Sequence, residues 1–469
     1  MNVKRNATAI GAALLAAGCA LGPFAGGDEL VSAYPVEETP HELTPLMERE
    51  LRGCFEFFWQ EWVSDPSLPT CGMTCGDYVG MNVHSPIPIE EQGFYFTAIV
   101  SAVERGWVSR SEGYERVLLA LKSIRKLKNF RGHYYHFYDK DGRRGWHDGK
   151  NVEVTNVGTA TMIAGAIVAG EYFGGEVAAT ADELYQRIDW KWFTDPVSKH
   201  CYLACYPEDV PPGTKVDENG FFGAWAAYSE HIILYVLGAG APVAERAIGA
   251  DSYYNMITYR GRYKGDEFIY CTTGAAFTYQ WTHCFVDFRN IEDRLGRNWF
   301  DNSRHAAIAA RQYAIDKANE IKGLGPDSWG LSACISPSTG YSGAYGSLPA
   351  GTGADERGLL QDGTVAPYAS SGFVVFTPEA SIESLEYMYT IPGLVGKYGL
   401  YDAYSFKTKA DGDKPWIGAS YLGIDKGIVS IMFENYSSQL IWKLFHQNRH
   451  VQRGLEVLEF SLSNDDIQE

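Results

Sequence analysis

The sequence predicts an all-α protein built as one toroid of helical hairpins. Apolar residues recur at three-to-four spacing in eight long segments, which is typical of amphipathic helices. No credible run of parallel strands separates these segments. Long connections rich in Gly, Asp and aromatic residues join them, notably at 130–157, 253–280 and 323–371, and loops of this length in a compact domain usually carry function.

The expected helices follow one another along the whole chain, and several begin with recognisable start signals. Ser109 with Glu112 forms a capping box, and Pro378 followed by Glu379 suits a first helical turn. The expected segments are 93–105, 109–127, 158–173, 178–192, 222–237, 301–321, 378–389 and 427–445. Because a closed ring of hairpins shares one core, we expect residues 41–469 to form a single domain.

The first 18 residues have the pattern of an export signal. Lys4 and Arg5 precede a short apolar run at 9–17, which is too short to span a bilayer, and small residues lead up to Cys19. We expect cleavage before Cys19, which would leave a lipidated cysteine on a tether over residues 19–40. This pattern resembles that of a bacterial lipoprotein of the periplasm or outer membrane. Ordinary secretion is the alternative, because Ala16 stands where Leu is more usual.

Composition narrows the classes of partner. The net charge of −18 and the absence of a basic stripe argue against nucleic acid or an anionic membrane surface, because phosphate binding depends on clustered Lys and Arg. A neutral ligand fits better, and a lipid anchor would be the protein's contact with a membrane. The 30 Tyr and 12 Trp serve either the core or a carbohydrate platform. We expect a monomer.

Cysteine usage predicts disulfides more readily than a metal site. Eight cysteines remain besides Cys19, an even number in a chain expected to meet an oxidising compartment, and Cys71 with Cys75 and Cys201 with Cys205 are the local candidates. The same two pairs could bind zinc, but their spacing is loose and no His pair accompanies them. The stretch 139–142 resembles the start of a calcium loop without its later ligands. We therefore expect no metal and no cofactor.

Glu230 is the strongest candidate for a catalytic acid. Trp225 and Tyr228 flank this carboxyl group just before the apolar segment 231–237, and desolvation in such a place disfavours the charged form. Glu230 can therefore keep its proton near neutral pH, which is what a glycosidase acid requires. The alternative is a helix-start acid placed there by the helix dipole.

Ordered sequence blocks over residues 44–446 extend this interpretation. They include Gly93–Trp107, Tyr135–Asp139, Ile188–Phe193, Tyr228–Glu230, Val286–Arg289, Asn302–Arg304, Ser328–Ser332, Asp362–Tyr368, Tyr398–Asp402, Leu422–Gly427 and Glu434–Tyr436. In these blocks the chain resembles the bacterial glycoamylase-like family, which includes the endo-β-1,2-glucanases of glycoside hydrolase family 144. The resemblance implies an (α/α)6 barrel, export, and action on β-1,2-linked glucans or related gluco-oligosaccharides rather than starch.

The resemblance also implies roles for particular acids. Glu230 matches the family's acid position, and Glu153 matches a second acidic position at the start of the next inner helix. Glycoside hydrolysis requires two carboxylates, one to protonate the leaving oxygen and one to act as base or nucleophile. This chain departs from the family at Gly158, where members usually carry Asp, so one expected carboxylate is missing.

Further residues of the matching blocks are candidates for substrate binding. Asp287, Asp362, Asp402 and Glu434 could bind hydroxyl groups or substitute as base, and each could equally pin a loop or cap a helix. Arg289 and Arg304 are candidate ion-pair partners for such acids.

Aromatic and histidine side chains are open to two interpretations each. Candidate sugar-binding aromatics, with core packing as the alternative, are Trp225, Tyr228, Trp329 and Tyr368. We expect His133, His136 and His283 to be packing residues rather than metal ligands.

Together these observations predict an exported glycoside hydrolase of the β-1,2-glucanase type. Glu230 would donate the proton and Glu153 would be the second carboxylate, with an inverting outcome. Two alternatives remain. The first is a related enzyme with the same barrel that acts on another linkage, cleaves from chain ends or transfers glycosyl groups. The second is a glycan-binding lipoprotein that has lost catalysis.

Overall fold

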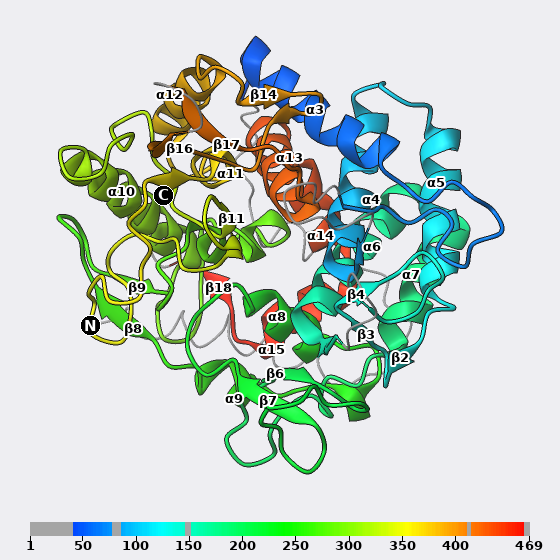
Figure 1. Ribbon diagram of the computed structural model, residues 1–469. Helices are drawn as coiled ribbons and strands as arrows, with labels where there is room; N and C mark the ends of the chain where they lie inside the picture. The colour runs from blue at the N-terminus through cyan, green and yellow to red at the C-terminus, as the bar shows by residue number, and fades with distance from the viewer. Residues whose placement is uncertain (1–40, 77–85, 146–151, 410–413, 464–469) are drawn as a thin grey trace, which may run out of the picture.

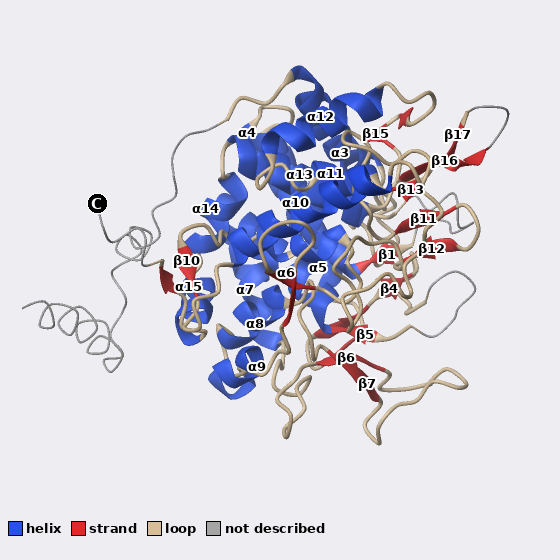
Figure 2. Ribbon diagram, turned by 90° about the vertical axis from the view of Figure 1, so that its left-hand side faces the viewer, coloured by secondary structure: helices blue, strands red, loops and turns tan. Residues whose placement is uncertain are grey.

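The computed structural model describes residues 41–76, 86–145, 152–409 and 414–463. Its main body is helical, and most of the short strands lie along one side of that body, which we call the strand side (Figure 2). The longer helices are α3 (Pro45–Gln60), α4 (Ile89–Glu104), α5 (Arg110–Ile124), α6 (Asn156–Phe173), α7 (Gly175–Arg187), α8 (Ile232–Ala239), α10 (Trp299–Lys317), α12 (Pro378–Tyr389), α13 (Gly423–Ser437), α14 (Leu440–Gln447) and α15 (Arg449–Val457), and the short ones are α9 (Ala250–Tyr254) and α11 (Pro367–Ser371).

The core forms where the inner helices pack together. Helix α4 contacts both α6 and α13, α6 also contacts α8, and α13 contacts α11, while α5 and α7 lie outside α4 and α6 (Figure 1). The contact between α4 and α6 depends on two glycines: a Cβ at Gly93 would lie 2.1 Å from the Thr161 carbonyl oxygen, and one at Gly165 would lie 2.1 Å from that of Gly93. Any larger residue would push the two helices apart.

Several expected helices match the structure. Residues 378–389 form α12 with Pro378 in its first turn, and both bonds of the capping box between Ser109 and Glu112 start α5. The expected helix 427–445 is two helices, because Gln439 takes a left-handed conformation with φ 60° between α13 and α14. Helices α3 and α15 were not expected.

The expected helix 222–237 is wrong in its first half. Residues Phe221–Ala224 form strand β7, which pairs antiparallel with β6 (Tyr202–Cys205), and helix α8 begins only at Ile232. Gly223 has φ 60°, a conformation outside the helical region. Glu230 therefore lies in the connection between a strand and a helix.

The strands correct the expectation of a purely helical protein. They pair antiparallel, the largest sheet having the order β2-β3-β5-β6-β7. Besides β6 and β7 they are β1 (Ile87–Pro88), β2 (Asn129–Phe130), β3 (His133–Tyr135), β4 (Phe137–Tyr138), β5 (Val154–Thr155), β8 (Tyr259–Gly261), β9 (Phe268–Tyr270), β10 (Ile291–Glu292), β11 (Cys334–Ser336), β12 (Gly340–Ser342), β13 (Thr364–Val365), β14 (Val395–Gly396), β15 (Gly399–Leu400), β16 (Ala403–Lys409), β17 (Pro415–Gly418) and β18 (Ser461–Leu462).

The disulfide expectation is wrong for the described cysteines. No disulfide joins any of the eight from Cys54 to Cys334. Cys201 and Cys205 lie four residues apart along an extended segment, which separates them by roughly 13 Å, whereas a disulfide needs Cα atoms within about 7 Å. The signal segment, the tether and Cys19 lie outside the described residues. Within the described part of the chain, no helix has the length and apolar character needed to cross a membrane.

Candidate active site

Four helices begin directly after strands of the strand side. Strand β1 leads into α4, β5 into α6, β13 into α11 and β17, after a short turn, into α13. The amino-terminal ends of these helices therefore meet on one face of the molecule. Glu90 and Glu91 start α4, Asn156 starts α6 and Asp425 lies in the first turn of α13.

Glu230 lies in the segment that connects β7 to α8 and is partly exposed. Burial of its carboxyl group raises its pKa, while the Ser229 hydroxyl, which donates a hydrogen bond to Glu230 Oε2, partly opposes that rise. The Glu230 carbonyl accepts a hydrogen bond of 3.0 Å from Thr282 Oγ1, which fixes the backbone. His231 makes no capping hydrogen bond through its side chain at the start of α8. A positioned carboxyl group with a raised pKa can act as a proton donor.

Asp402 and Asp425 form a buried pair of carboxyl groups, 4% exposed each. The Ile335 amide donates a 2.6 Å hydrogen bond to Asp402 Oδ2, but no donor among the described residues reaches Asp402 Oδ1 or either oxygen of Asp425. Burial, and after it the charge of Asp402, raises the pKa of Asp425 well above its usual range. Burial also raises the pKa of Asp402. Like charges in a buried pair disfavour double ionisation, so the pair holds a proton to higher pH than an isolated aspartate does.

A cavity borders this acid pair. Its lining includes Tyr368, Ser371, Tyr421 and Lys426 besides both carboxyl groups. The Ser371 hydroxyl has no partner among the described residues, so the cavity offers several unused polar atoms. Unpaired buried polar atoms are costly, and a bound water or a sugar hydroxyl would satisfy them.

The charges of both the acid pair and Glu230 act on the Tyr341 hydroxyl. Tyr341 belongs to the β11–β12 hairpin, and its side chain is 39% exposed. Burial of its hydroxyl raises its pKa, followed by the charges of Asp425, Asp402, Cys334 and Glu230. The hydroxyl of Tyr341 therefore lies within electrostatic reach of both the proposed acid and the carboxyl pair.

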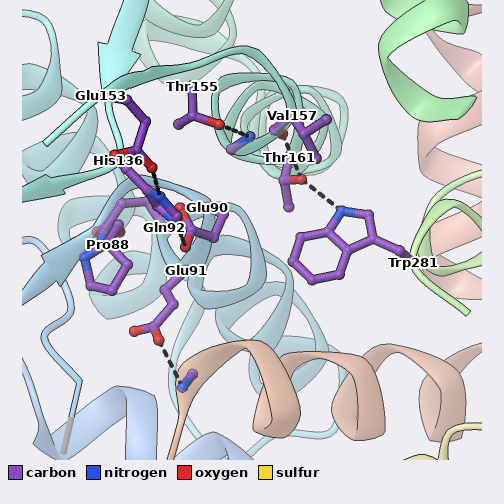
Figure 3. A network of polar contacts seen from close by, with 12 residues as sticks. Pro88, Glu90, Glu91, Gln92, His136, Glu153, Thr155, Val157, Thr161 and Trp281 are labelled. Carbon is purple, nitrogen blue, oxygen red and sulfur yellow. Dashed lines mark hydrogen bonds and ion pairs between the residues drawn. The ribbon is translucent and has the colours of Figure 1, made fainter. Parts of the chain in front are cut away.

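Glu153 takes part in a second acidic cluster. His136 lies between two carboxylates, with Nδ1 2.7 Å from Glu153 Oε1 and Nε2 3.0 Å from Glu90 Oε1 (Figure 3). Since ionised carboxylates only accept hydrogen bonds, both ring nitrogens carry a proton and His136 is an imidazolium. Burial lowers the pKa of His136, but Glu90 and Glu153 outweigh it and the pKa is raised. Burial raises the pKa of Glu153, but His136 outweighs it and brings the value to about 2.

Glu91 ties two inner helices together at the same face. Its Oε1 accepts a 2.9 Å hydrogen bond from the Gly423 amide at the start of α13 (Figure 3). A Cβ at Gly423 would lie 2.4 Å from the Glu91 carboxyl carbon, so the two helix ends are in close contact. This contact aligns α4 and α13, which carry the two acidic clusters.

The expected aromatic platforms divide into one partly exposed ring and three buried ones. Trp225 is partly buried, stacks on His231 at 4.8 Å and donates from Nε1 to Asn156 Oδ1 at 3.1 Å. Tyr228 stacks on Trp299 in the core, and Trp329 is fully buried beside Phe373. A buried ring offers no face to a sugar, so Tyr228 and Trp329 serve core packing.

Tyr368 is also buried, with its hydroxyl donating to Ser332 Oγ at 2.8 Å and to the Ala333 carbonyl at 3.0 Å. Tyr368 lines the cavity beside Asp402 and Asp425, and this is its contact with the candidate site.

Three expected hydroxyl-binding acids have structural partners instead. Asp287 is paired with Arg289 at 2.8 Å, as its sequence neighbourhood suggested, and its amide contacts His446 in α14. Glu434 is paired with Arg105 at 2.7 Å near the carboxyl-terminal end of α13, which is the opposite end from Asp425. Asp362 accepts a hydrogen bond of 2.7 Å from Tyr345 and holds the turn before β13. The geometry separates Asp287 and Glu434 from the acidic clusters.

The remaining arginine and histidine expectations have mixed outcomes. Arg304 pairs with Asp301 on α10, away from the acidic clusters. His133 and His283 are buried packing residues, as expected. His136 is different, because besides stacking on Phe137 at 4.3 Å it is the centre of an ion-paired cluster.

Sequence reasoning missed Glu90, Asp425 and Tyr341. A signal existed for Asp425, which lies inside a matching block, and for Glu90, which opens an otherwise apolar helix next to a second acid. Tyr341 carries no signal, because only the folding of the β11–β12 hairpin brings its hydroxyl towards the acids.

Comparisons with known proteins identify a matching family and a curated relative. The model of the family described as "Putative glucoamylase" matches residues 223–449, a span that includes Glu230, Tyr341, Asp402 and Asp425. The resemblance to this family is therefore confirmed. A curated relative, the exo β-1,2-glucooligosaccharide sophorohydrolase (non-reducing end) of Parabacteroides distasonis, is 24% identical over 92% of the chain. The chain spans only 60% of the length of that relative.

Solved structures of similar proteins agree with the fold. A putative glucoamylase of Bacteroides fragilis is 26% identical, with a TM-score of 0.74 over 92% of this chain and 100% of that one. The endo-β-1,2-glucanase of Chitinophaga pinensis, in a sophorotriose and glucose complex, is 26% identical with a TM-score of 0.75 over 90% of this chain and 99% of that one. An endo-β-1,2-glucanase of Talaromyces funiculosus shares the fold alone, at 10% identity and a TM-score of 0.59.

Proposed function

We propose that the protein is a glycoside hydrolase acting on β-1,2-glucan or related β-linked gluco-oligosaccharides. The observation that carries this proposal is that burial raises the pKa of Glu230, Asp402 and Asp425, and that the charges of all three act on Tyr341. Two carboxyl groups in different protonation states are what glycoside hydrolysis requires. The similarity to proteins named as hydrolases of β-1,2-linked glucans supports the substrate class.

In the proposed reaction, Glu230 donates its proton to the glycosidic oxygen as the bond to the anomeric carbon breaks. One carboxylate of the Asp402–Asp425 pair accepts a proton from a water, whose oxygen forms the new bond to the anomeric carbon. We favour this pair over Glu153 as the base. A carboxylate with a pKa of about 2, held by His136, is a weak base near neutral pH, whereas burial raises the pKa of Asp402 to about 6, which is closer to the working range.

The decisive experiment compares Glu230→Gln with the wild-type protein on a panel of β-linked glucans, following new reducing ends. Gln keeps the shape but has no acidic proton, so kcat should fall by about 10²–10⁴-fold while KM changes little. Glu379→Gln, at an exposed position in the first turn of α12, is the matched control and should retain full activity. Wild-type turnover by Glu230→Gln on an ordinary glycoside would refute the acid assignment.

A parallel comparison tests the base. Asp402→Asn and Asp425→Asn should each lower kcat by a similar factor, because either change removes one of the two carboxyl groups that the pair needs to hold one proton and accept another. We propose an inverting outcome, so the first product detected by NMR should have the anomeric configuration opposite to that of the substrate. A product that retains the configuration would refute this outcome. If the wild-type protein binds glucans without cleaving them, the glycan-binding alternative applies.

We also propose that the inner helices close into an (α/α)6 barrel and that the protein is an exported, lipid-anchored monomer. The chain of contacts from α11 through α13, α4 and α6 to α8 supports the barrel. An experimental structure with six inner helices would test it. For the anchor, the full-length protein should partition with membranes, and Cys19→Ser should release it or block processing. Equal solubility of both forms would favour secretion.

A further inference from the structure

Two aromatic rings form an open pair at the end of the largest sheet. Tyr206 directly follows β6, Phe222 lies in β7, and their rings stack at 5.3 Å with an angle of 16°. The hydrogen bond of 2.8 Å from the Tyr206 amide to the Gly220 carbonyl holds the two strand ends together. Both side chains are only partly buried, and each covers one face of the other. Because both residues are only partly buried, part of this aromatic pair is open to solvent.

Glu153 lies beside this aromatic pair. The Tyr206 hydroxyl donates to Glu153 Oε2 at 3.5 Å, and His136 holds Oε1 at 2.7 Å. The side chains of Glu153 and His136 are 24% and 34% exposed, so solvent reaches both. Since each carboxylate oxygen can accept two hydrogen bonds, Glu153 retains capacity for further donors.

His136 and Glu90 hold this carboxylate in place. Glu90 is buried, and its Oε1 lies 3.0 Å from His136 Nε2. The buried Glu90 fixes the imidazolium of His136, and the imidazolium fixes Glu153 (Figure 3). The result is a carboxylate with a lowered pKa, positioned as a hydrogen-bond acceptor next to an aromatic face.

We propose that Tyr206, Phe222 and Glu153 form a subsite for one glucosyl unit of the substrate, separate from the point of cleavage at Glu230. The C–H face of the sugar stacks on the aromatic pair, and Glu153 accepts hydrogen bonds from its hydroxyl groups. His136 and Glu90 are positioning residues. The identification of the ligand as a glucosyl unit rests on the proposed function. Aromatic and carboxylate groups alone would also suit other neutral sugars.

The test measures binding separately from hydrolysis. In the Glu230→Gln background, calorimetry gives Kd for β-1,2-linked gluco-oligosaccharides of increasing length. Tyr206→Ala should raise Kd about tenfold for oligosaccharides long enough to reach the subsite and leave the shortest ones unchanged. Tyr206→Phe keeps the stacking and should change Kd less than threefold. Tyr172→Ala, a partly buried tyrosine near the carboxyl end of α6, is the matched control and should have no effect.

The outcomes separate the subsite from the proposed function. Unchanged Kd values for Tyr206→Ala at every length would overturn the subsite, even if the wild-type protein hydrolyses the glucan. Length-dependent loss of binding, with a wild-type protein that cleaves nothing, would overturn the hydrolase assignment and leave the subsite standing. If Tyr206→Ala does not fold, as judged by circular dichroism, Phe222→Leu tests the same stacking face and should raise Kd in the same length-dependent way.

Discussion

The hydroxyl of Ser229 donates a hydrogen bond to the carboxylate of Glu230, the residue that follows it. The same hydroxyl lies 3.4 Å from Cys271 Sγ, which lies 3.3 Å from Thr273 Oγ1. This chain of polar contacts holds Ser229 in one orientation. Because a hydrogen bond to the ionised form favours that form, Ser229 limits the rise in the pKa of Glu230 that burial causes.

Removing that hydroxyl should change the pH profile of activity. In Ser229→Ala the pKa of Glu230 rises, by about one unit for a lost hydrogen bond to a charged group. Activity that needs protonated Glu230 is lost as pH rises through this pKa, so the alkaline limb of the kcat/KM profile should move to higher pH. Ser229→Thr keeps the hydroxyl and should keep the wild-type profile. An unchanged alkaline limb in Ser229→Ala would exclude this role.

A carboxylate introduced at Gly158 should not be tolerated. A Cβ there would lie 2.7 Å from Thr155 Cγ2 and 2.9 Å from Glu90 Oε2, so Gly158→Asp adds both crowding and a like charge. We expect a loss of roughly 1–3 kcal/mol of stability, read as a lower Tm, and no gain of activity. The double variant Glu90→Ala/Gly158→Asp removes the like charge and the contact with Glu90, although the contact with Thr155 remains, and it should be more stable than Gly158→Asp alone. A single variant with wild-type Tm would contradict this account.

The buried pair of Lys426 and Glu50 should be a major stabilising contact. Lys426 Nζ lies 2.8 Å from Glu50 Oε1 and joins α13 to α3, with the two side chains 6% and 3% exposed. Lys426→Met leaves Glu50 charged and buried without its partner, which should cost about 3–5 kcal/mol. The double variant Glu50→Gln/Lys426→Met should recover much of that loss.

The exposed pair of Arg52 and Glu56 serves as the comparison for this prediction. These side chains are 43% and 36% exposed, so Arg52→Met should cost less than about 1 kcal/mol. Urea denaturation of the wild type and the three variants measures each difference. Equal losses of unfolding free energy for Lys426→Met and Arg52→Met would show that the buried ion pair stabilises the protein no more than the exposed one.

The cluster of His136, Glu153 and Glu90 should stabilise the protein most at mildly acidic pH. The pKa of Glu153 is lowered in the folded state, so its contribution is present above its usual pKa of 4.5 and is lost as pH falls towards about 2. The pKa of His136 is raised, so its contribution is complete below its usual 6.5 and is lost as pH rises through the higher folded value. Both contributions are therefore present between pH 4.5 and 6.5.

His136→Gln tests that window. The variant should lose stability relative to the wild type, by roughly 1–2 kcal/mol after allowance for partial exposure, and the difference should be greatest near pH 5–6. Denaturation curves at pH 3, 5.5 and 9 measure it. A difference that is the same at all three values would mean that His136 contributes through packing alone.

Local sequence patterns were sufficient for much of the helical framework and for selecting Glu230 as a candidate. The capping box of Ser109 and Glu112 and the start of α12 at Pro378 depend on groups within one helical turn, so they could be identified from neighbours along the chain. Glu230 was also found from its neighbours, although its segment is a strand and a connection rather than a helix. Pairing of β7 with β6 decided that difference, because strand pairing depends on residues distant in sequence.

Only the tertiary structure decided which acids share a neighbourhood. Asp402 and Asp425 both face the cavity beside α11, and Glu90 meets Glu153 through His136. Asp287 and Glu434, which look equally suitable in the sequence, lie in ion pairs instead. The physical reason is that proton affinity depends on burial and on the nearest charges, and these are set by how helices and strands pack rather than by the order of residues along the chain.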